Sequence, residues 1–237
     1  MVILYQLENK IMINKILIII FFVIRISTLS FGQCESDSII NNVYEPKIQA
    51  TIWHNTQMLP DEQFFNKWTK GDVYLTDGNV VKNQYLRYNQ CFDEILWLRK
   101  NDYQIGQLIK SMISGFTLYD INLNDKISFT KKKIFLWTKN DSVDVFVHRL
   151  LDGKIGLYIW HHSIVLNSAK TEIKHNKVFY IQYKGRMISF KPNRYNLYKI
   201  LPEYKEILKE IIHNHKLIVR KEENLRKVIE ELNGKIK

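Results

Sequence analysis

The sequence lacks the short motifs that identify many catalytic sites. It contains no Gly-x-Ser-x-Gly turn, which would present a nucleophilic serine, and no His-Glu-x-x-His helix, which would hold zinc. It also shows no internal repeat and no low-complexity tract. These absences argue against the common hydrolase and metalloprotease classes and against a repeat array, and we expect neither a metal nor another cofactor.

Dense basic clusters are also nearly absent, although the formal net charge is +11. Lys131–Lys133 is the one compact run, and the other basic residues are spread along the chain. A nucleic-acid-binding surface would need a one-sided stripe or a basic arm. We therefore expect a solvated surface and no nucleic-acid partner, with weak attraction to anionic lipid or polysaccharide as the alternative.

A hydrophobic run long enough to span a membrane is missing as well. The apolar stretch Ile16–Ile24 ends at Arg25, short of the roughly 20 residues that a spanning helix needs. Lys15 precedes the stretch, and Ser30 and Gly32 supply small residues for a cleavage site. The pattern predicts a signal peptide over residues 1–32, with Met12 as an alternative start, and an exported protein that is periplasmic, outer-membrane-associated or secreted. No transmembrane span is expected after its removal.

Cysteine is scarce, with two residues in the whole chain. Cys34 follows the predicted cleavage site and Cys91 lies in the body of the protein. Because exported proteins meet an oxidising compartment, a Cys34–Cys91 disulfide is one hypothesis. Lipidation of Cys34 and two free thiols are the alternatives.

Alternating apolar residues predict an α+β protein that is mainly antiparallel β, with a meander or sandwich-like sheet in a β-rich domain over residues 33–193. Asp77-Gly78 and Asp152-Gly153 each predict a hairpin with a two-residue turn, and Gly185 joins a third. The first turn would place Leu75 opposite Val80 and Tyr74 opposite Val81. We expect one helical turn near residues 61–68 and a turn at Lys131–Lys133.

The period of the pattern changes after residue 193. Apolar residues recur at helical spacing from Tyr204 to Ile212, after Pro202, and again from Leu225 to Leu232. Acidic residues begin the second segment and Gly234 follows its expected end at Asn233. The sequence therefore predicts two amphipathic helices, within residues 194–237, that pack on the same domain.

Several of these features together resemble a known sequence pattern. It comprises Gly71-x-Val73, Asp77-Gly78, Leu86-Arg87-Tyr88-Asn89 and Asp93-Glu94-Ile95, followed by a lysine-rich helical end. The chain resembles an uncharacterised family of secreted proteins from Bacteroidota. The resemblance implies export and a β-rich body, and the family carries no established activity.

One grouping of acid and imidazole follows from the expected register of the second hairpin. A two-residue turn at Asp152-Gly153 places Asp144 opposite His161 on the face that also carries His148. A carboxylate that orients a histidine is half of a general-base arrangement, and two imidazoles with a carboxylate are also admissible zinc ligands. A structural Asp–His pair is the alternative. Surface aromatics at Tyr85, Tyr88, Trp97 and Trp137 could stack on a glycan, or else fill the core.

We therefore expect an exported non-enzymatic binding or assembly protein whose partner is an envelope protein or a glycan. The alternatives are an extracytoplasmic hydrolase that uses Asp144 and His161, and a carrier of hydrophobic ligands. Hydrogen-bond contact between Asp144 and His161 in an open pocket would favour the hydrolase.

Overall fold

The structure is a computed structural model that describes residues 39–41, 48–53, 64–65, 67–120, 125–136, 140–167 and 172–236. Residues Ile39–Lys237 form one compact unit. The predicted signal peptide, Cys34 and Trp137 lie outside the described residues, as do residues 61–63 and 66 of the helical turn expected near residues 61–68. Phe64 and Phe65 of that turn lie in bends and not in a helix.

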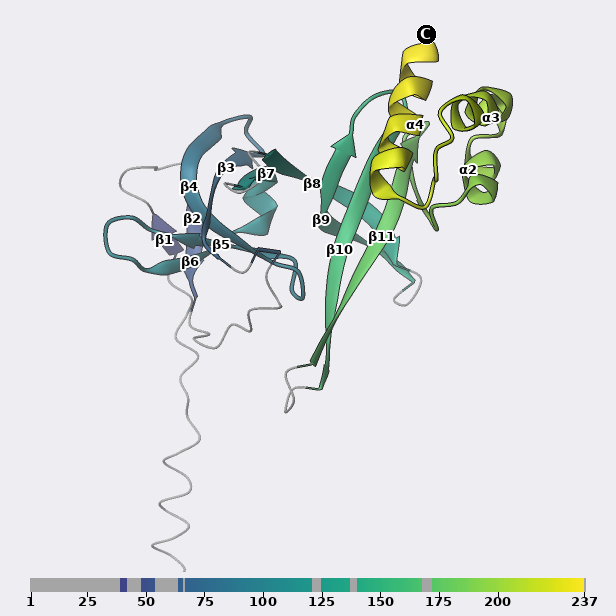
Figure 1. The fold of residues 1–237 in the computed structure, drawn as a ribbon. Helices are drawn as coiled ribbons and strands as arrows, with labels where there is room; N and C mark the ends of the chain where they lie inside the picture. The colour runs from purple at the N-terminus through teal and green to yellow at the C-terminus, as the bar shows by residue number, and fades with distance from the viewer. Residues whose placement is uncertain are drawn as a thin grey trace, which may run out of the picture. The chain divides into compact units, whose positions relative to one another are not determined.

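The described residues confirm an α+β chain dominated by antiparallel sheet (Figure 1). Their strands join in a single 12-stranded sheet rather than the two sheets of a sandwich, in the order β1-β2-β6-β5-β4-β3-β7-β8-β9-β10-β11-β12. The strands are β1 (Ile39–Asn41), β2 (Gln49–Ile52), β3 (Thr69–Leu75), β4 (Val80–Asn89), β5 (Glu94–Leu98), β6 (Ile105–Leu108), β7 (Ile113–Asp120), β8 (Asp125–Leu136), β9 (Asp141–Leu151), β10 (Gly156–Asn167), β11 (Glu172–Tyr183) and β12 (Arg186–Phe190).

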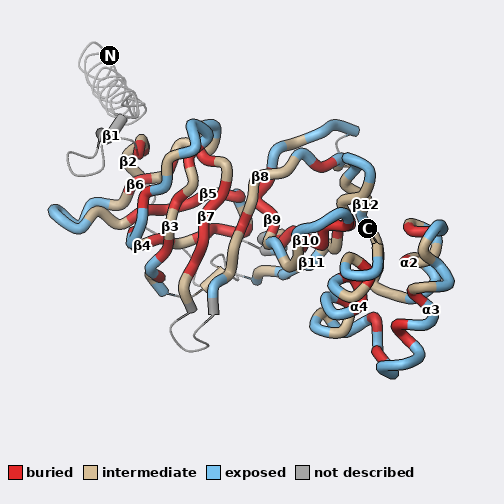
Figure 2. The backbone as a smooth tube through the Cα atoms, turned by 90° about the horizontal axis from the view of Figure 1, so that it is seen from above, coloured by how far each residue is buried: buried red, intermediate tan, exposed pale blue. Residues whose placement is uncertain are grey.

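The strands from β2 to β9 share one hydrophobic core, and buried stretches run along β3, β5 and β7 (Figure 2). Phe116 and Phe129 stack in its centre with ring centroids 4.6 Å apart, and Phe146 meets Phe116 edge-on. Gly71 allows β3 to approach β7 closely, because a Cβ there would lie 2.0 Å from the Thr117 carbonyl oxygen. Burial of these large side chains supplies most of the driving force for this part of the sheet.

The first predicted hairpin forms, but its register differs by one residue. Tyr74 lies opposite Val80, not Val81, and the Leu75 N–H donates to the Asn79 carbonyl. The loop therefore has three residues, with Gly78 at φ +85°. A three-residue loop with glycine in the left-handed region is a common alternative to the two-residue turn.

The hairpin at Gly185 is confirmed, and the turn expected at Lys131–Lys133 is wrong. Lys184 and Gly185 both have positive φ and join Tyr183 to Arg186, as a two-residue type I′ turn requires. Lys131–Lys133 lies inside β8 and pairs with β9. Pairing with β9 is continuous through these lysines, and the buried side chains on either side of them, Phe129 and Ile134, belong to different clusters on opposite faces.

The C-terminal part of the described chain contains three α-helices rather than two. The first has no counterpart among the predicted helices, and its N-terminus is capped by the Asn193 side chain, 2.8 Å from the Asn196 N–H. Pro202 begins a short 3₁₀ turn (η3, Pro202–Tyr204), and the last helix continues through Gly234 to Lys235. The α-helices are α2 (Arg194–Ile200), α3 (Lys205–Asn214) and α4 (Glu222–Lys235).

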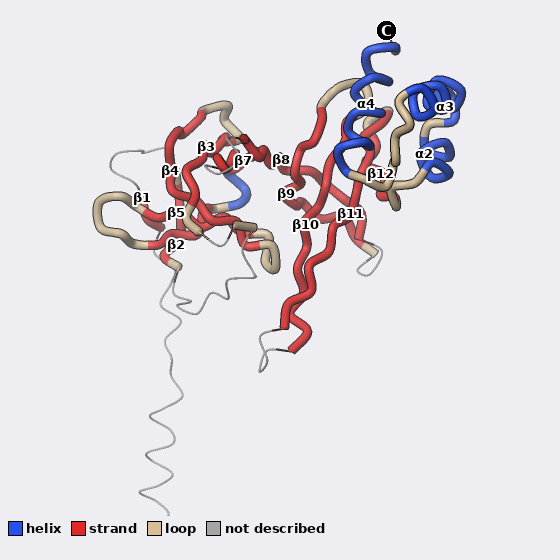
Figure 3. Tube along the Cα trace, viewed as in Figure 1, coloured by secondary structure: helices blue, strands red, loops and turns tan. Residues whose placement is uncertain are grey.

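These helices pack on one face of the strands at the end of the sheet (Figure 3). Leu208, Ile211, Val228 and Ile229 are buried in a cluster that also contains residues of β10 and β11, such as Leu157. The opposite face of β8 to β11 carries a smaller cluster around Tyr158 and Trp160, to which no described helix contributes. Among the described helices, none combines the length and hydrophobicity needed to cross a membrane.

Candidate functional site

The expected pairing of Asp144 with His161 is wrong. In the β9–β10 hairpin His148 lies opposite Ile159, so the register is shifted by two residues, and no pairing of β9 with β10 follows beyond this point among the described residues. Asp144 is solvent-exposed and pairs with Lys133 of β8, whereas His161 is buried and pairs with Lys177 of β11. The Asp–His arrangement of the hydrolase hypothesis is therefore not formed.

His148 and His161 do meet, as two imidazoles in an aromatic environment. Their Nδ1 and Nε2 atoms lie 3.4 Å apart, and the His161 ring meets Phe64 edge-on at 4.7 Å. Burial, and next the neighbouring His148, lowers the pKa of His161 to about 3. Within the described residues no group of three potential metal ligands occurs. Buried His161 is thus packed among aromatic rings, with half-buried His148 beside it.

Ser163 and His175 form a contact that the sequence analysis missed. Ser163 Oγ lies 2.7 Å from His175 Nδ1, because the two residues face each other across β10 and β11. Only the correct strand register could have revealed it. Ser163 is 2% exposed, so a substrate cannot reach its hydroxyl, and no described carboxylate hydrogen-bonds to His175. A nucleophilic role is therefore not supported.

The turn between β4 and β5 lies where β9 and β10 separate. The Ser163 N–H donates to the Gln90 carbonyl at 3.3 Å, and the Phe146 N–H donates to both Asp93 carboxylate oxygens, at 3.1 and 3.2 Å. The Asn89 side chain accepts from the Cys91 N–H at 2.9 Å and shapes the turn. The turn thus bonds to both separated strands.

Asp93 is the polar centre of this junction. Its carboxylate also accepts from the Tyr88 hydroxyl at 2.6 Å and pairs with Lys110, from the short 3₁₀ turn η2 (Lys110–Met112). Burial raises the pKa of Asp93, and the Lys110 charge opposes that shift. The carboxylate is enclosed by four donor contacts, and its role is to hold the turn in place.

A groove of about 560 Å³ opens beside this turn, on the face of the sheet that the helices leave uncovered. Three of its lining residues are large hydrophobic side chains with high exposure: Phe92 at 60%, Ile164 at 43% and Phe135 at 41%. Trp160 lines its floor, with His162 stacked on the indole at 4.6 Å. The charged groups Asp93, Lys110 and Asp144 also contribute to the lining.

Trp160 contributes one more feature to the groove. Its indole N–H is buried and has no hydrogen-bond partner among the described residues. A buried donor left without a partner costs about 1–3 kcal/mol. Trp160 therefore lines the groove and carries a covered N–H group whose bonding is incomplete.

The other predicted site residues are structural or lie outside the described residues. Tyr88 and Trp97 are each 1% exposed and belong to the core, so they form no glycan-stacking surface. Tyr85 is half-buried, with the Lys100 ammonium over its ring at 6.0 Å. Cys91 is half-buried in the lining of the groove. Because Cys34 is not described, the Cys34–Cys91 disulfide stays a prediction.

Comparison of the chain with protein-family models, with curated proteins and with solved structures finds no significant match. Any assignment of function therefore rests on the geometry of the chain itself.

Proposed function

We propose that the protein is an exported, non-enzymatic binding component that holds a small apolar ligand in the groove beside the β4–β5 turn. The observation that carries the proposal is the exposure of Phe92, Phe135 and Ile164 around one concave surface. Leaving these side chains in water is unfavourable by about 25 cal/mol per Å² of apolar area, and a ligand that covers them recovers that free energy.

The size and chemistry of the groove define the ligand class. A volume of about 560 Å³ is in the usual range for small-molecule sites, which are mostly apolar with a few polar groups that fix orientation. The covered indole N–H of Trp160 lacks a partner, and one hydrogen-bond acceptor on the ligand would complete its bonding once the side chains over it move aside. We therefore favour a compact, neutral, ring-containing molecule with one acceptor atom.

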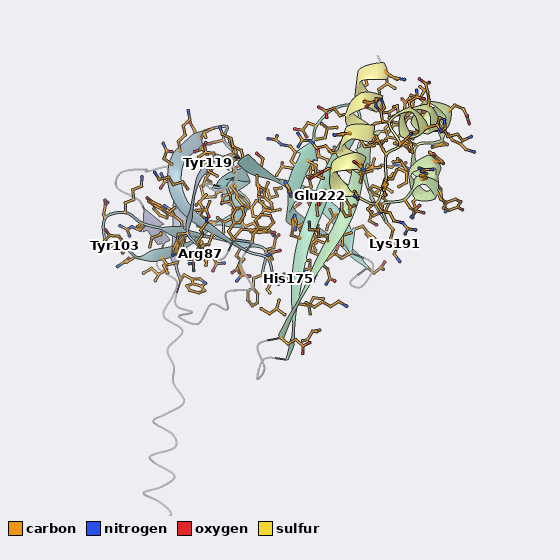
Figure 4. The ribbon with its side chains drawn as sticks, in the orientation of Figure 1. Arg87, Tyr103, Tyr119, His175, Lys191 and Glu222 are labelled. Atoms are coloured by element: carbon orange, nitrogen blue, oxygen red, sulfur yellow. The ribbon has the colours of Figure 1, made fainter. Side chains whose placement is uncertain are left out.

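Binding of the neutral dye Nile red, followed by its fluorescence, tests the proposal. Phe92→Asn removes an apolar wall of the groove from an exposed turn, and we expect the dissociation constant to rise several-fold. Tyr103→Asn is the matched control, because Tyr103 is 76% exposed, has positive φ and does not line the groove (Figure 4). Equal affinities for the two variants would refute binding in this groove.

Export is a separate part of the proposal, supported by the apolar stretch Ile16–Ile24 and the small residues Ser30 and Gly32. N-terminal sequencing of the mature protein from the envelope and the culture medium should give a start at Gln33 or Cys34. A mature protein that retains residues 12–32 would contradict cleavage.

A further inference from the structure

The strand β11 is longer than its outer neighbour, and this leaves part of the sheet edge open. β12 ends with Phe190 opposite Phe179, whereas β11 begins at Glu172. Residues 172–178 therefore pair with β10 on one side, and on the other side no described strand pairs with them. Figure 1 shows β10 and β11 extending together beyond the other strands, and Figure 4 marks His175 on this extension.

The hairpin geometry identifies the backbone groups on the open side. In a two-residue hairpin the residues next to the turn, here Tyr183 and Arg186, exchange both hydrogen bonds. The backbone N–H and C=O groups of every second residue of β11 then point toward β12. Past the end of β12 the same series continues with Ile173, His175 and Lys177. The N–H and C=O groups of these three residues have no partner among the described residues.

A basic hollow of about 870 Å³ adjoins this open edge, where β12 ends and the chain turns into α2. Phe179, Ile188 and Ile200 form apolar parts of its wall, and Lys177, Lys191 and Lys199 lie among them. Lys177 pairs with Glu222 at 3.1 Å. Lys191 and Lys199 are exposed and have no acidic partner among the described residues, and Figure 4 marks Lys191 in this region.

We propose that the open edge of β11 binds an extended, acidic segment of a partner protein as an added strand. Backbone bonding to Ile173, His175 and Lys177 would supply the affinity, and alternate side chains of the segment would enter the basic hollow. Acidic side chains complement Lys191 and Lys199, whereas the same edge of a second copy of this chain carries Lys174 and Lys177 and adds positive charge. This site is separate from the groove of the proposed function and is tested independently of it.

A fluorescein-labelled peptide of alternating glutamate and valine, followed by fluorescence anisotropy with the full chain, tests the backbone part. Ile173→Pro removes one outward N–H but leaves the bonds to β10, because proline is tolerated where the N–H of an edge strand faces solvent. We expect about tenfold weaker binding from the lost hydrogen bond and the altered edge. Circular dichroism should show an unchanged fold. Unchanged affinity, or no binding to the unmodified protein, overturns the proposal.

Charge reversal tests the acidic preference. The double variant Lys191→Glu, Lys199→Glu should weaken peptide binding by at least the same factor. The control is the double variant Lys205→Glu, Lys227→Glu, which changes the net charge equally at exposed positions of α3 and α4 outside the hollow. Equal losses for the two double variants would mean that only net charge attracts the peptide. Vesicles of anionic lipid are a second probe. If the protein binds these vesicles but not the peptide, and Ile173→Pro does not weaken the vesicle binding, strand addition is rejected.

Amide hydrogen exchange followed by NMR gives a readout that a nonspecific effect would not reproduce. In the free protein the amides of Ile173, His175 and Lys177 should exchange quickly, and those of Lys174 and Asn176, which face β10, slowly. The peptide should protect the first group. If the amides of Ile173, His175 and Lys177 are already protected before peptide is added, another segment covers the edge. If light scattering also shows a dimer, that segment belongs to a second copy of the chain.

Discussion

Asp93 is the residue that secures the β4–β5 turn to β9. Asp93→Ala would leave the Phe146 N–H without an acceptor and the buried Tyr88 hydroxyl with only its long contact to the Phe146 carbonyl, at 3.4 Å. We expect a loss of about 2–4 kcal/mol in the free energy of unfolding. Asp93→Asn keeps an oxygen acceptor and suits the positive φ of 58° at this position, so its loss should be smaller. Urea denaturation of both variants measures the difference. Equal losses would mean that the hydrogen bonds do not stabilise the turn.

The importance of Asp93 could not be predicted from its neighbours in the sequence. Asp93 has a positive φ and stands in the turn one residue before β5, so strand alternation does not describe its position. Two of the three partners of Asp93 are Lys110 and Phe146, which lie 17 and 53 positions away. Periodicity describes which face a residue takes on its own strand, and contains no information about which distant strand that face meets.

At the scale of elements, α4 is bonded to the loop between β9 and β10 by a single side chain. The Asn233 amide accepts from the Ile155 N–H at 3.0 Å and donates to the Ile155 carbonyl at 2.8 Å. Asn233→Ala should lower the free energy of unfolding by about 1–3 kcal/mol, because Ile155 is fully buried. Asn224→Ala on the same helix is the control, since no described residue hydrogen-bonds to its side chain. Thermal unfolding should show a lower midpoint for the first variant alone.

The same contact explains why the predicted register of the second hairpin is wrong. A tight turn at Asp152-Gly153 would pair Ile155 with Leu150, but the Ile155 backbone bonds to Asn233 instead. The loop consequently lengthens, and Leu151 lies opposite Leu157. The Lys184-Gly185 turn was predictable because its geometry depends only on local φ preferences. The Asp152-Gly153 register depends on a residue 78 positions away, which a local pattern does not contain.

At the scale of the whole chain, the class of fold follows from alternation and helical spacing, while the candidate sites do not. Val145 and Trp160 belong to strands that the alternation predicts, yet the groove that they line exists because β9 and β10 separate around the β4–β5 turn. The exposed Phe92 is part of that turn and has no periodic signal. Sites formed where distant elements meet are therefore the part of this molecule that sequence patterns leave undetermined.

The buried His161 should make the stability of the whole molecule depend on pH. Its pKa is lowered to about 3, chiefly by burial, whereas an unfolded histidine titrates near 6.5. Between these values the unfolded state binds more protons than the folded state, so stability falls on acidification by up to about 1.4 kcal/mol per pH unit. Above pH 6.5 histidine is neutral in both states, and the contribution is constant.

Urea denaturation of His161→Phe between pH 7 and pH 4 tests this dependence. The variant removes the titrating group but keeps an aromatic ring beside Phe64 and Phe129. The prediction concerns the slope of the free energy of unfolding against pH, which should become shallower. The value at neutral pH is not the readout, because His148 also loses a partner in this variant. His213→Gln, at an exposed position of α3, should keep the original slope. If His161→Phe also keeps that slope, His161 is not the group that couples folding to protons, and the acid sensitivity belongs to other residues.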